Sequence, residues 1–407
     1  MKNTFFLISS SVISKIFTFA FIVFAARFLG VKGFGVYALV FSLLSIFTVV
    51  SDFGFYSLIV RDVSRDIKFS SKYLTHVLFV KLFLVILAYV GFYFLAFFLN
   101  YSLEVKIIIL IAGIGLIADS LRYTLNAFFF VYQRVDILSI SNVFYSLVNS
   151  IFGILIFISG YGVKEIFLQI ALVNWLFLFI TLFIILKYFT SLEREIDFAF
   201  LKRLIKQVFP FAFLSILSIV YFKIDTVLLS IFKDERAVGY YNAPYKLIET
   251  LMFIPSALSA VLFPFVSSFS VRSKEALYQS YKWALKFLSF IVFPIVVFCT
   301  VLNKQIIECL LGKEYLISSP VFIVLIWALL FIFINAPAGN IIYNSKYLNS
   351  FIIWAVFNTS LNIFLNIIFI PKYSFLGAGY VTLFTEFTGT IINFYFLKKI
   401  LWGRECN

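Results

Sequence analysis

Charged residues are scarce in this chain. Only 13% of its 407 residues are Asp, Glu, Lys or Arg, whereas 63% are hydrophobic. Soluble domains carry about 25% charged and roughly 45–50% apolar residues. The deficit of charge excludes an ordinary water-soluble domain and predicts that lipid is the main solvent of the chain.

Histidine and cysteine are rarer still. The single histidine is His76, and the three cysteines, Cys299, Cys309 and Cys406, lie far apart without a CxxC pair. No group of His, Cys and carboxylates has the spacing of metal ligands, and no GxxxxGK[ST] phosphate loop occurs. We therefore expect no metal site, no disulfide framework and no direct use of ATP, and we interpret His76 as a structural residue.

Long apolar runs are what the chain has in abundance. A helix of roughly 20 apolar residues crosses a hydrocarbon core about 30 Å thick, whereas barrel strands would give roughly 10-residue alternating segments. Such runs occupy residues 4–26, 36–59, 77–99, 106–128, 137–159, 165–187, 208–231, 240–266, 284–302, 317–341, 348–370 and 376–397. They predict an all-α integral membrane protein with about twelve transmembrane helices. The first run exceeds the roughly 7–15-residue core of a signal peptide, so we expect it to remain as the first crossing.

Basic residues are distributed unequally between the connections. If the amino terminus is cytoplasmic, 21 of the 33 Lys and Arg fall on the inner side and nine on the outer side. The remaining three, Lys15, Lys223 and Lys246, lie inside the apolar runs. Because an excess of basic residues marks the cytoplasmic side, we expect both termini in the cytoplasm. The net charge of +14 is then a topology signal and does not indicate a nucleic-acid partner.

The chain divides near its midpoint. A polar connection between Lys187 and Gln207 separates six runs from six, so we expect an N-lobe at 1–190, a linker at 191–206 and a C-lobe at 207–407. Phe34-Gly35-Val36-Tyr37 resembles Val238-Gly239-Tyr240-Tyr241, and each lies in the first outer connection of its half. The match favours a parallel internal repeat.

Some polar residues lie where the bilayer core is expected, and an ionised group costs about 2.5–3.5 kcal/mol there unless it faces protein or a wet cavity. Lys15 is too deep in its run for its stem to reach the membrane edge, which favours a cavity. Asn242, Tyr245, Lys246 and Glu249 share one helix face, where a cavity and a Lys246–Glu249 pair are equally good interpretations. Asp119 and Arg122 favour a structural pair, and stripes of Ser, Thr and Asn favour helix packing.

Several segments together resemble the Wzx-like O-antigen flippases, a polysaccharide biosynthesis family of the multidrug/oligosaccharidyl-lipid/polysaccharide exporter superfamily. These segments are Ala26-Arg27-Phe28-Leu29-Gly30 with Phe34-Gly35-Val36-Tyr37, Asp52-Phe53-Gly54 followed by Arg61, Asp225 with Val238-Gly239-Tyr240-Tyr241, Pro255, Pro264, and Ile370-Pro371-Lys372-Tyr373 with Leu376-Gly377-Ala378-Gly379 and Glu386.

The resemblance implies two six-helix lobes in a V around a central cavity, in the cytoplasmic (inner) membrane of a bacterium. It implies an undecaprenyl-diphosphate-linked oligosaccharide substrate and, as partners, membrane lipids, a polysaccharide polymerase and chain-length proteins. Cavities of relatives are often arginine-rich, whereas this chain offers lysines, which are point charges rather than bidentate forks. The candidate cavity residues are Lys15, Lys223, Lys246, Asn242 and Tyr245.

The expected function is a flippase that carries an O-antigen or capsule repeat unit to the periplasmic leaflet by alternating access, without catalysis and without a cofactor. Asp52, Asp225, Glu249 and Glu386 are candidates for coupling to H⁺ or Na⁺. A drug or cation antiporter of the same superfamily is the alternative, although lysines suit an acidic, cation-binding cavity poorly. An O-antigen polymerase is less consistent with short outer connections and one histidine.

Overall fold

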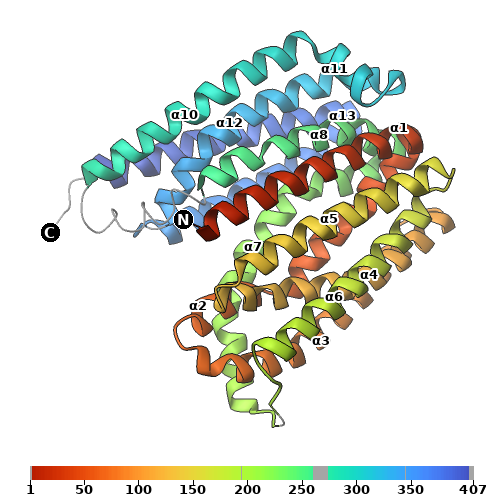
Figure 1. Ribbon diagram of the computed structural model, residues 1–407. Coiled ribbons are helices and arrows are strands. Elements are labelled where there is room, and N and C mark those ends of the chain that lie inside the picture. The colour runs from red at the N-terminus through yellow and green to blue at the C-terminus, as the bar shows by residue number, and fades with distance from the viewer. Residues whose placement is uncertain (1, 194, 260–273, 344, 403–407) are drawn as a thin grey trace. The chain divides into compact units, whose positions relative to one another are not determined.

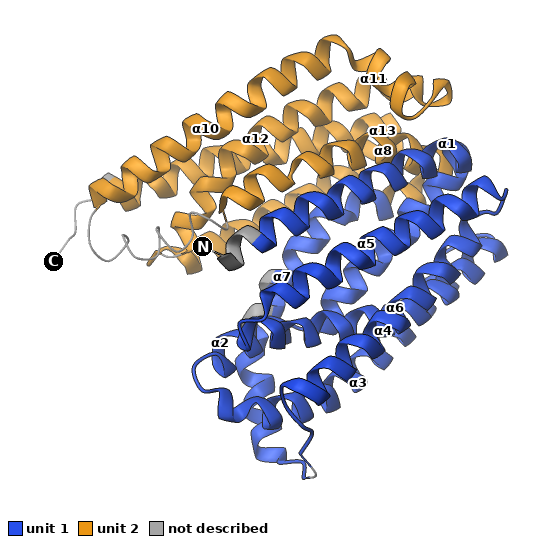
Figure 2. Cartoon of the chain, in the orientation of Figure 1, with its two compact units in different colours: residues 1–227 blue, residues 228–407 orange. Residues whose placement is uncertain are grey.

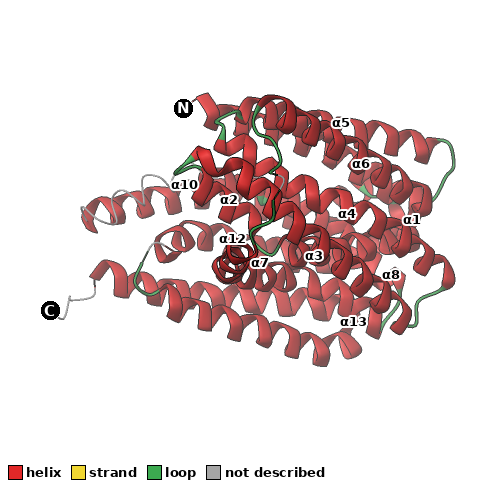
Figure 3. Ribbon diagram, turned by 90° about the horizontal axis from the view of Figure 1, so that it is seen from below, coloured by secondary structure: helices red, strands yellow, loops and turns green. Residues whose placement is uncertain are grey.

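The computed structural model describes residues 2–193, 195–259, 274–343 and 345–402. In these residues the regular elements are all helices (Figure 3), and eight of the described helices are long and apolar enough to cross a membrane. Two of the eight are bent: α13 contains two of the predicted runs, and α1 contains run 4–26 and most of run 36–59. The all-α membrane fold of about twelve crossings is confirmed. The end of run 240–266, Pro264 and Cys406 lie outside the described residues.

The chain separates into two compact units, residues 1–227 and 228–407 (Figure 2). The elements of the first are α1 (Lys2–Asp52), α2 (Phe55–Val63), η1 (Ile67–Phe69), α3 (Ser70–Phe98), α4 (Leu103–Val131), α5 (Val135–Ile158), α6 (Val163–Tyr188) and most of α7 (Phe198–Phe232). Those of the second are α8 (Glu235–Leu251), α10 (Lys274–Val301), α11 (Asn303–Leu310), η2 (Lys313–Ser318), α12 (Ser319–Tyr343) and α13 (Leu348–Trp402) (Figure 1).

Two of the predicted outer connections are single-residue breaks inside long helices. In α1 the break is Gly30, whose φ of 62° and ψ of −178° suit a residue without Cβ. In α13 the break is Ser374, with φ 53°. Gly377 follows at the same corner, where an added Cβ would lie 2.6 Å from the carbonyl oxygen of Phe369. The sequence placed loops at both points because hydropathy does not distinguish a loop from a sharp bend.

A third break interrupts run 36–59. Helix α1 ends at Asp52, and Phe53 and Gly54 adopt left-handed φ values of 52° and 83° before α2 begins. The second crossing is therefore shorter than the sequence predicted, and Asp52 lies at its end.

The segment predicted as a linker at 191–206 is fixed to the first unit. Just before this segment the Tyr132 hydroxyl donates to the Phe189 carbonyl (2.8 Å), and within it the Glu193 amide donates to the Thr75 hydroxyl (2.7 Å). Helix α7 begins at Phe198, and Phe200 packs in the same apolar cluster as α2, α3 and α4. The boundary between the two units falls within α7, beyond the predicted linker.

Candidate functional site

A buried ion pair joins three helices of the first unit. The Lys81 ammonium on α3 lies 3.1 Å from Asp52 Oδ1, and the Thr124 hydroxyl of α4 donates to the same oxygen at 2.7 Å. The other carboxylate oxygen accepts from the Gly54 amide at 3.2 Å. The left-handed turn at Phe53 and Gly54 places that amide beside the Asp52 side chain. Asp52, which the sequence offered as a coupling carboxylate, thus has a cationic partner and two further donors.

Lys81 is a residue that sequence reasoning missed. It lies near the start of run 77–99, and its side chain has 0% exposed surface. The only sequence signal was its place inside run 77–99. Its partner lies 29 residues away on another helix, and a single sequence does not show such a pairing.

A second polar cluster of the first unit surrounds Arg122. Its Nη2 donates to Asp119 Oδ1 at 2.9 Å, and its guanidinium lies 4.2 Å from the centroid of the Tyr145 ring. The Tyr145 hydroxyl donates to Asn174 Oδ1 (2.7 Å), and Asn174 Nδ2 donates to the Gly115 carbonyl (3.2 Å). The Asp119–Arg122 pair that the sequence predicts is present within α4, and the contacts of Tyr145 and Asn174 tie α4 to α5 and α6.

In the second unit, α8 carries the other predicted pair. Lys246 Nζ lies 2.7 Å from Glu249 Oε2; Lys246 is buried, whereas Glu249 keeps partial exposure. Tyr241 and Tyr245 stack with centroids 5.6 Å apart. The predicted residues Asn242 and Tyr245 are both buried. The two opposite charges compensate each other on one face of α8. Because Glu249 is partly exposed, its carboxylate stays accessible to a ligand.

A polar seam runs between α12 and α13. Asn335 Nδ2 on α12 lies 3.4 Å from Glu386 Oε2, and Asn393 Nδ2 donates to Asn335 Oδ1 at 3.0 Å. Glu386, a candidate for ion coupling, is buried in this seam. The sequence predicts Glu386 as a candidate residue but does not predict its partner Asn335 on α12.

The same seam continues along the first arm of α13. Asn362 Nδ2 donates to the Thr385 hydroxyl at 3.3 Å, and Asn366 Nδ2 donates to Asn362 Oδ1 at 3.1 Å. Asn358, Asn362 and Asn366 are four residues apart, a helical spacing that could have signalled them.

The remaining predicted residues belong to the first unit. Lys15 on α1 is exposed, and Lys223 and Asp225 on α7 are buried. Lys246, Asn242, Tyr245, Glu249 and Glu386 belong to the second unit. Within each unit the structure pairs Asp52 with Lys81 and Lys246 with Glu249; a cavity shared by all the predicted residues stays a prediction.

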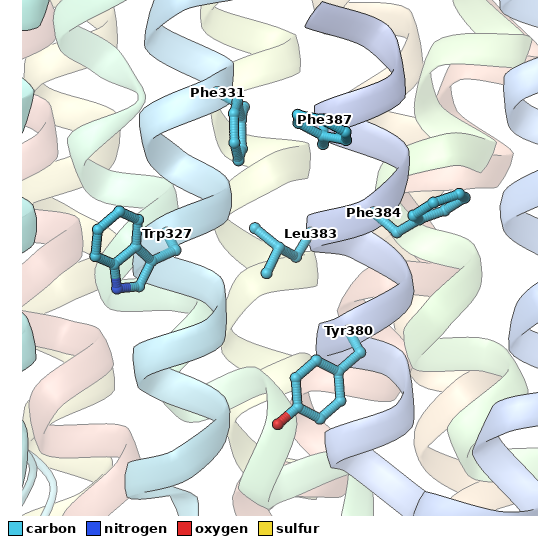
Figure 4. A pocket seen from close by; sticks show the side chains of 6 residues that line it. All are labelled: Trp327, Phe331, Tyr380, Leu383, Phe384 and Phe387. Carbon is cyan, nitrogen blue, oxygen red and sulfur yellow. The ribbon is translucent and has the colours of Figure 1, made fainter.

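One pocket, of about 440 Å³, lies on the second unit between α12 and α13. Figure 4 shows its lining, with Trp327 and Phe331 on one helix and Tyr380, Leu383, Phe384 and Phe387 on the other. None of the predicted site residues lines it. An apolar groove of this kind in a membrane helix pair suits a hydrocarbon chain, and it provides no charge for a polar ligand.

Among the described residues, no three His, Cys, Asp or Glu side chains are grouped so as to hold a metal ion. The polar groups of the clusters described above are ammonium, guanidinium, carboxylate, amide and hydroxyl groups. Such groups bind ions and hydrogen-bonding ligands.

Comparison with known proteins gives a family match for residues 24–320, with the family described as polysaccharide biosynthesis protein. The capsular polysaccharide biosynthesis protein CapF of Staphylococcus aureus is 26% identical over 279 residues, which are 66% of this chain and 70% of that protein. An uncharacterised membrane protein of Methanocaldococcus jannaschii is 25% identical over 224 residues, 54% of this chain and 44% of that protein.

The probable low-salt glycan biosynthesis flippase of Haloferax volcanii is 21% identical over 178 residues, which are 44% of this chain and 38% of that protein. The chain thus spans less than half the length of two of these curated relatives.

Among solved structures, the lipid II flippase MurJ in an inward closed conformation superposes with a TM-score of 0.78 at 18% identity, over 97% of this chain and 90% of that one. A multidrug resistance transporter of the MATE family in its inward-facing conformation gives a TM-score of 0.74 at 16% identity, over 95% and 94%. These similarities show a shared fold.

Proposed function

The chain belongs to the polysaccharide biosynthesis protein family, and we propose that it is a flippase for a polyprenyl-diphosphate-linked oligosaccharide. The transported unit would be an O-antigen or capsule repeat on undecaprenyl diphosphate, moved from the cytoplasmic to the periplasmic leaflet by alternating access. The family match and the fold shared with solved transporters support transport rather than catalysis. The observation that carries the proposal is the family match over residues 24–320 in a chain that shares its fold with a lipid II flippase.

The polar residues support a substrate with an anionic diphosphate and hydroxyl-rich sugars. Lys15, Lys223 and Lys246 lie on predicted crossings, and Asn242 and Tyr245 offer hydrogen-bonding groups on the same face as Lys246. Ammonium groups and neutral donors together match a phosphate bearing a glycan. These five residues are our proposed substrate contacts.

Energy for transport would come from an ion gradient. Asp225, Glu249 and Glu386 are the carboxylates we propose for coupling to H⁺ or Na⁺. Asp52 belongs to the same proposed set, but its contacts with Lys81 and Thr124 favour a structural role.

We place the protein in the bacterial cytoplasmic membrane with both termini in the cytoplasm, since 21 of its 33 basic residues then face inward. In that setting a polysaccharide polymerase and chain-length proteins would receive the transported unit.

A drug or cation antiporter is the second candidate, favoured by the fold shared with a MATE transporter. Lysines on the predicted crossings, such as Lys223, suit a cationic drug poorly because like charges repel. The lysines in the crossings therefore favour the anionic, lipid-linked oligosaccharide over a cationic drug as the substrate.

The test is deletion of the gene in its native host, followed by extraction of lipid-linked glycans and a leaflet assay with a membrane-impermeant glycosidase or lectin. Single repeat units held on the cytoplasmic leaflet, released when the wild-type gene is restored, are the expected result. Units that reach the outer leaflet but stay unpolymerised would point to a polymerase. Unchanged glycans with a new sensitivity to cationic drugs would point to the antiporter.

A further inference from the structure

Lysines and tyrosines from three segments gather at one end of the second unit. The lysine–tyrosine cluster consists of Tyr278 and Lys282 on α10, Lys346 and Tyr347 before α13, and Tyr395 and Lys399 near the end of α13. Lys399 Nζ lies 4.6 Å from the Tyr395 ring centroid and 6.0 Å from that of Tyr347. Lys346 Nζ lies 5.7 Å from the same Tyr347 ring, and Lys282 Nζ lies 5.9 Å from that of Tyr278.

An apolar base holds these segments together. Leu277 and Tyr281 of α10, Ile342 of α12, and Phe396 and Leu401 of α13 form one buried cluster, against which Tyr278 and Tyr347 pack. The beginning of α10 and the end of α13 accordingly lie at the same end of the unit (Figure 1). The Tyr347 amide donates to the Ser345 hydroxyl at 3.2 Å, which fixes the turn before α13. The cluster is therefore a built surface and not a chance meeting of mobile side chains.

Among the residues that the structure describes, no carboxylate is paired with the lysines of the cluster. Lys282, Lys346 and Lys399 are exposed, and none of the three is in an ion pair with another described residue. The nearby acid Glu275 accepts a hydrogen bond from Gln279 at 2.7 Å. Lys346 and Lys399 contact the same ring, so their ammonium groups are at most about 12 Å apart, a spacing comparable with the Debye length of about 8 Å. Two like charges held this close favour an anion between them.

The position along α10 indicates the depth of the cluster. Trp283 and Phe287 stack with centroids 5.3 Å apart on the exposed side of α10, and Phe290 and Phe293 continue that side. Aromatic rings beside lysines at the end of an apolar helix mark the headgroup region of a bilayer. At this depth, basic side chains between membrane helices bind the anionic headgroups of lipids.

From this geometry we propose that the lysine–tyrosine cluster is a binding site for the phosphodiester headgroup of an anionic phospholipid. Lys346 and Lys399 pair with the phosphate, Lys282 extends the positive surface along α10, and the tyrosine rings keep the ammonium groups in place through cation–π contacts. The acyl chains lie along the exposed aromatic side of α10. The site does not depend on what the protein transports.

The experiment uses the full chain purified in detergent and native mass spectrometry with added dioleoyl phosphatidylglycerol or dioleoyl phosphatidylcholine. Wild type should retain phosphatidylglycerol in preference to phosphatidylcholine. The double variant Lys346→Gln/Lys399→Gln should weaken phosphatidylglycerol binding about 25-fold, because each lysine near a charged surface contributes about fivefold. Binding of phosphatidylcholine should not change.

Two controls separate this site from a general effect of charge. Lys164→Gln/Lys304→Gln removes the same charge from two exposed lysines elsewhere and should bind phosphatidylglycerol as wild type does. Lys346→Arg/Lys399→Arg keeps the charge and should retain most of the binding.

An unchanged affinity in the Lys346→Gln/Lys399→Gln variant, or equal losses in that variant and in Lys164→Gln/Lys304→Gln, would overturn the proposal. So would preferential binding of farnesyl diphosphate at the cluster without any binding of phosphatidylglycerol, since the site would then serve a prenyl diphosphate. Each variant is compared with wild type for thermal stability, so that unfolding is not mistaken for lost binding.

Discussion

The Lys81 ammonium and the Asp52 carboxylate lie 3.1 Å apart, with the lysine side chain fully enclosed. A buried ion pair contributes little net stability over an apolar pair, but the removal of one partner leaves the other charge buried without compensation. Asp52→Asn should therefore destabilise the protein by about 3–5 kcal/mol, seen as a lower midpoint of thermal unfolding in detergent. The double variant Asp52→Asn/Lys81→Met should regain much of the loss. If Asp52→Asn is as stable as wild type but fails in transport, the residue acts in ion coupling and our structural interpretation is wrong.

Lys246 offers a direct test of the proposed substrate contacts. A charge-assisted hydrogen bond to a diphosphate is worth about 1.5–3 kcal/mol, so Lys246→Ala should reduce export of lipid-linked glycan by about tenfold or more while the protein level stays constant. Quantification of surface polysaccharide in a complemented deletion strain measures the effect. The exposed residue Lys206 supplies the matched control, and Lys206→Ala should export normally. Export by Lys246→Ala at the wild-type rate would remove this residue from the proposed site.

The contact between Arg122 and the Tyr145 ring predicts that lysine cannot replace arginine at position 122 without a loss of stability. Arg122→Lys keeps the charge but loses the flat contact with Tyr145, 4.2 Å away. A buried cation–π contact is worth about 2 kcal/mol, so the unfolding midpoint should fall. The exposed pair Arg134–Asp136, at 3.0 Å, is the control, because exposed pairs contribute about 0–1 kcal/mol and Arg134→Lys should have little effect. Equal effects at both arginines would contradict the role of burial.

The ion pair of Asp197, in the connection between α6 and α7, should make the thermal stability of the protein depend on pH. Lys72 donates to Asp197 Oδ2 at 2.9 Å, and this hydrogen bond, with that from the Phe200 amide, lowers the pKa of Asp197 to about 2. The unfolded value is about 3.9. A depressed folded pKa stabilises the protein above the unfolded value, and this contribution is lost as the pH falls from about 4 towards 2.

Wild type should therefore melt at a higher temperature than Asp197→Asn at pH 6, and the difference between the two midpoints should shrink as the pH falls from about 4 towards 2. Lys72→Met should reproduce the behaviour of Asp197→Asn. A difference in midpoint that stays constant over this range would show that the carboxylate charge is not involved.

The crossings were predictable from the sequence because the thickness of the bilayer imposes a length on every apolar helix. The breaks at Gly30 and Ser374 were not, since a single residue with positive φ redirects a helix without any change in hydropathy. The Lys246–Glu249 and Asp119–Arg122 pairs could be foreseen because both members share one helix face. The Lys81 partner of Asp52 and the Asn335 partner of Glu386 come from other helices, and only the packed structure brings them together.

The junction of α3 with the start of α7 contains the one histidine of the chain. The Asp197 amide donates to His76 Nε2 at 2.8 Å, so the ring proton is on Nδ1 and is donated to the Lys72 carbonyl at 2.7 Å. Protein grown with ¹⁵N-labelled histidine would thus give imidazole signals from this junction alone. With no engineered label, those two nitrogens would report whether the beginning of α7 stays attached to α3 while the protein works.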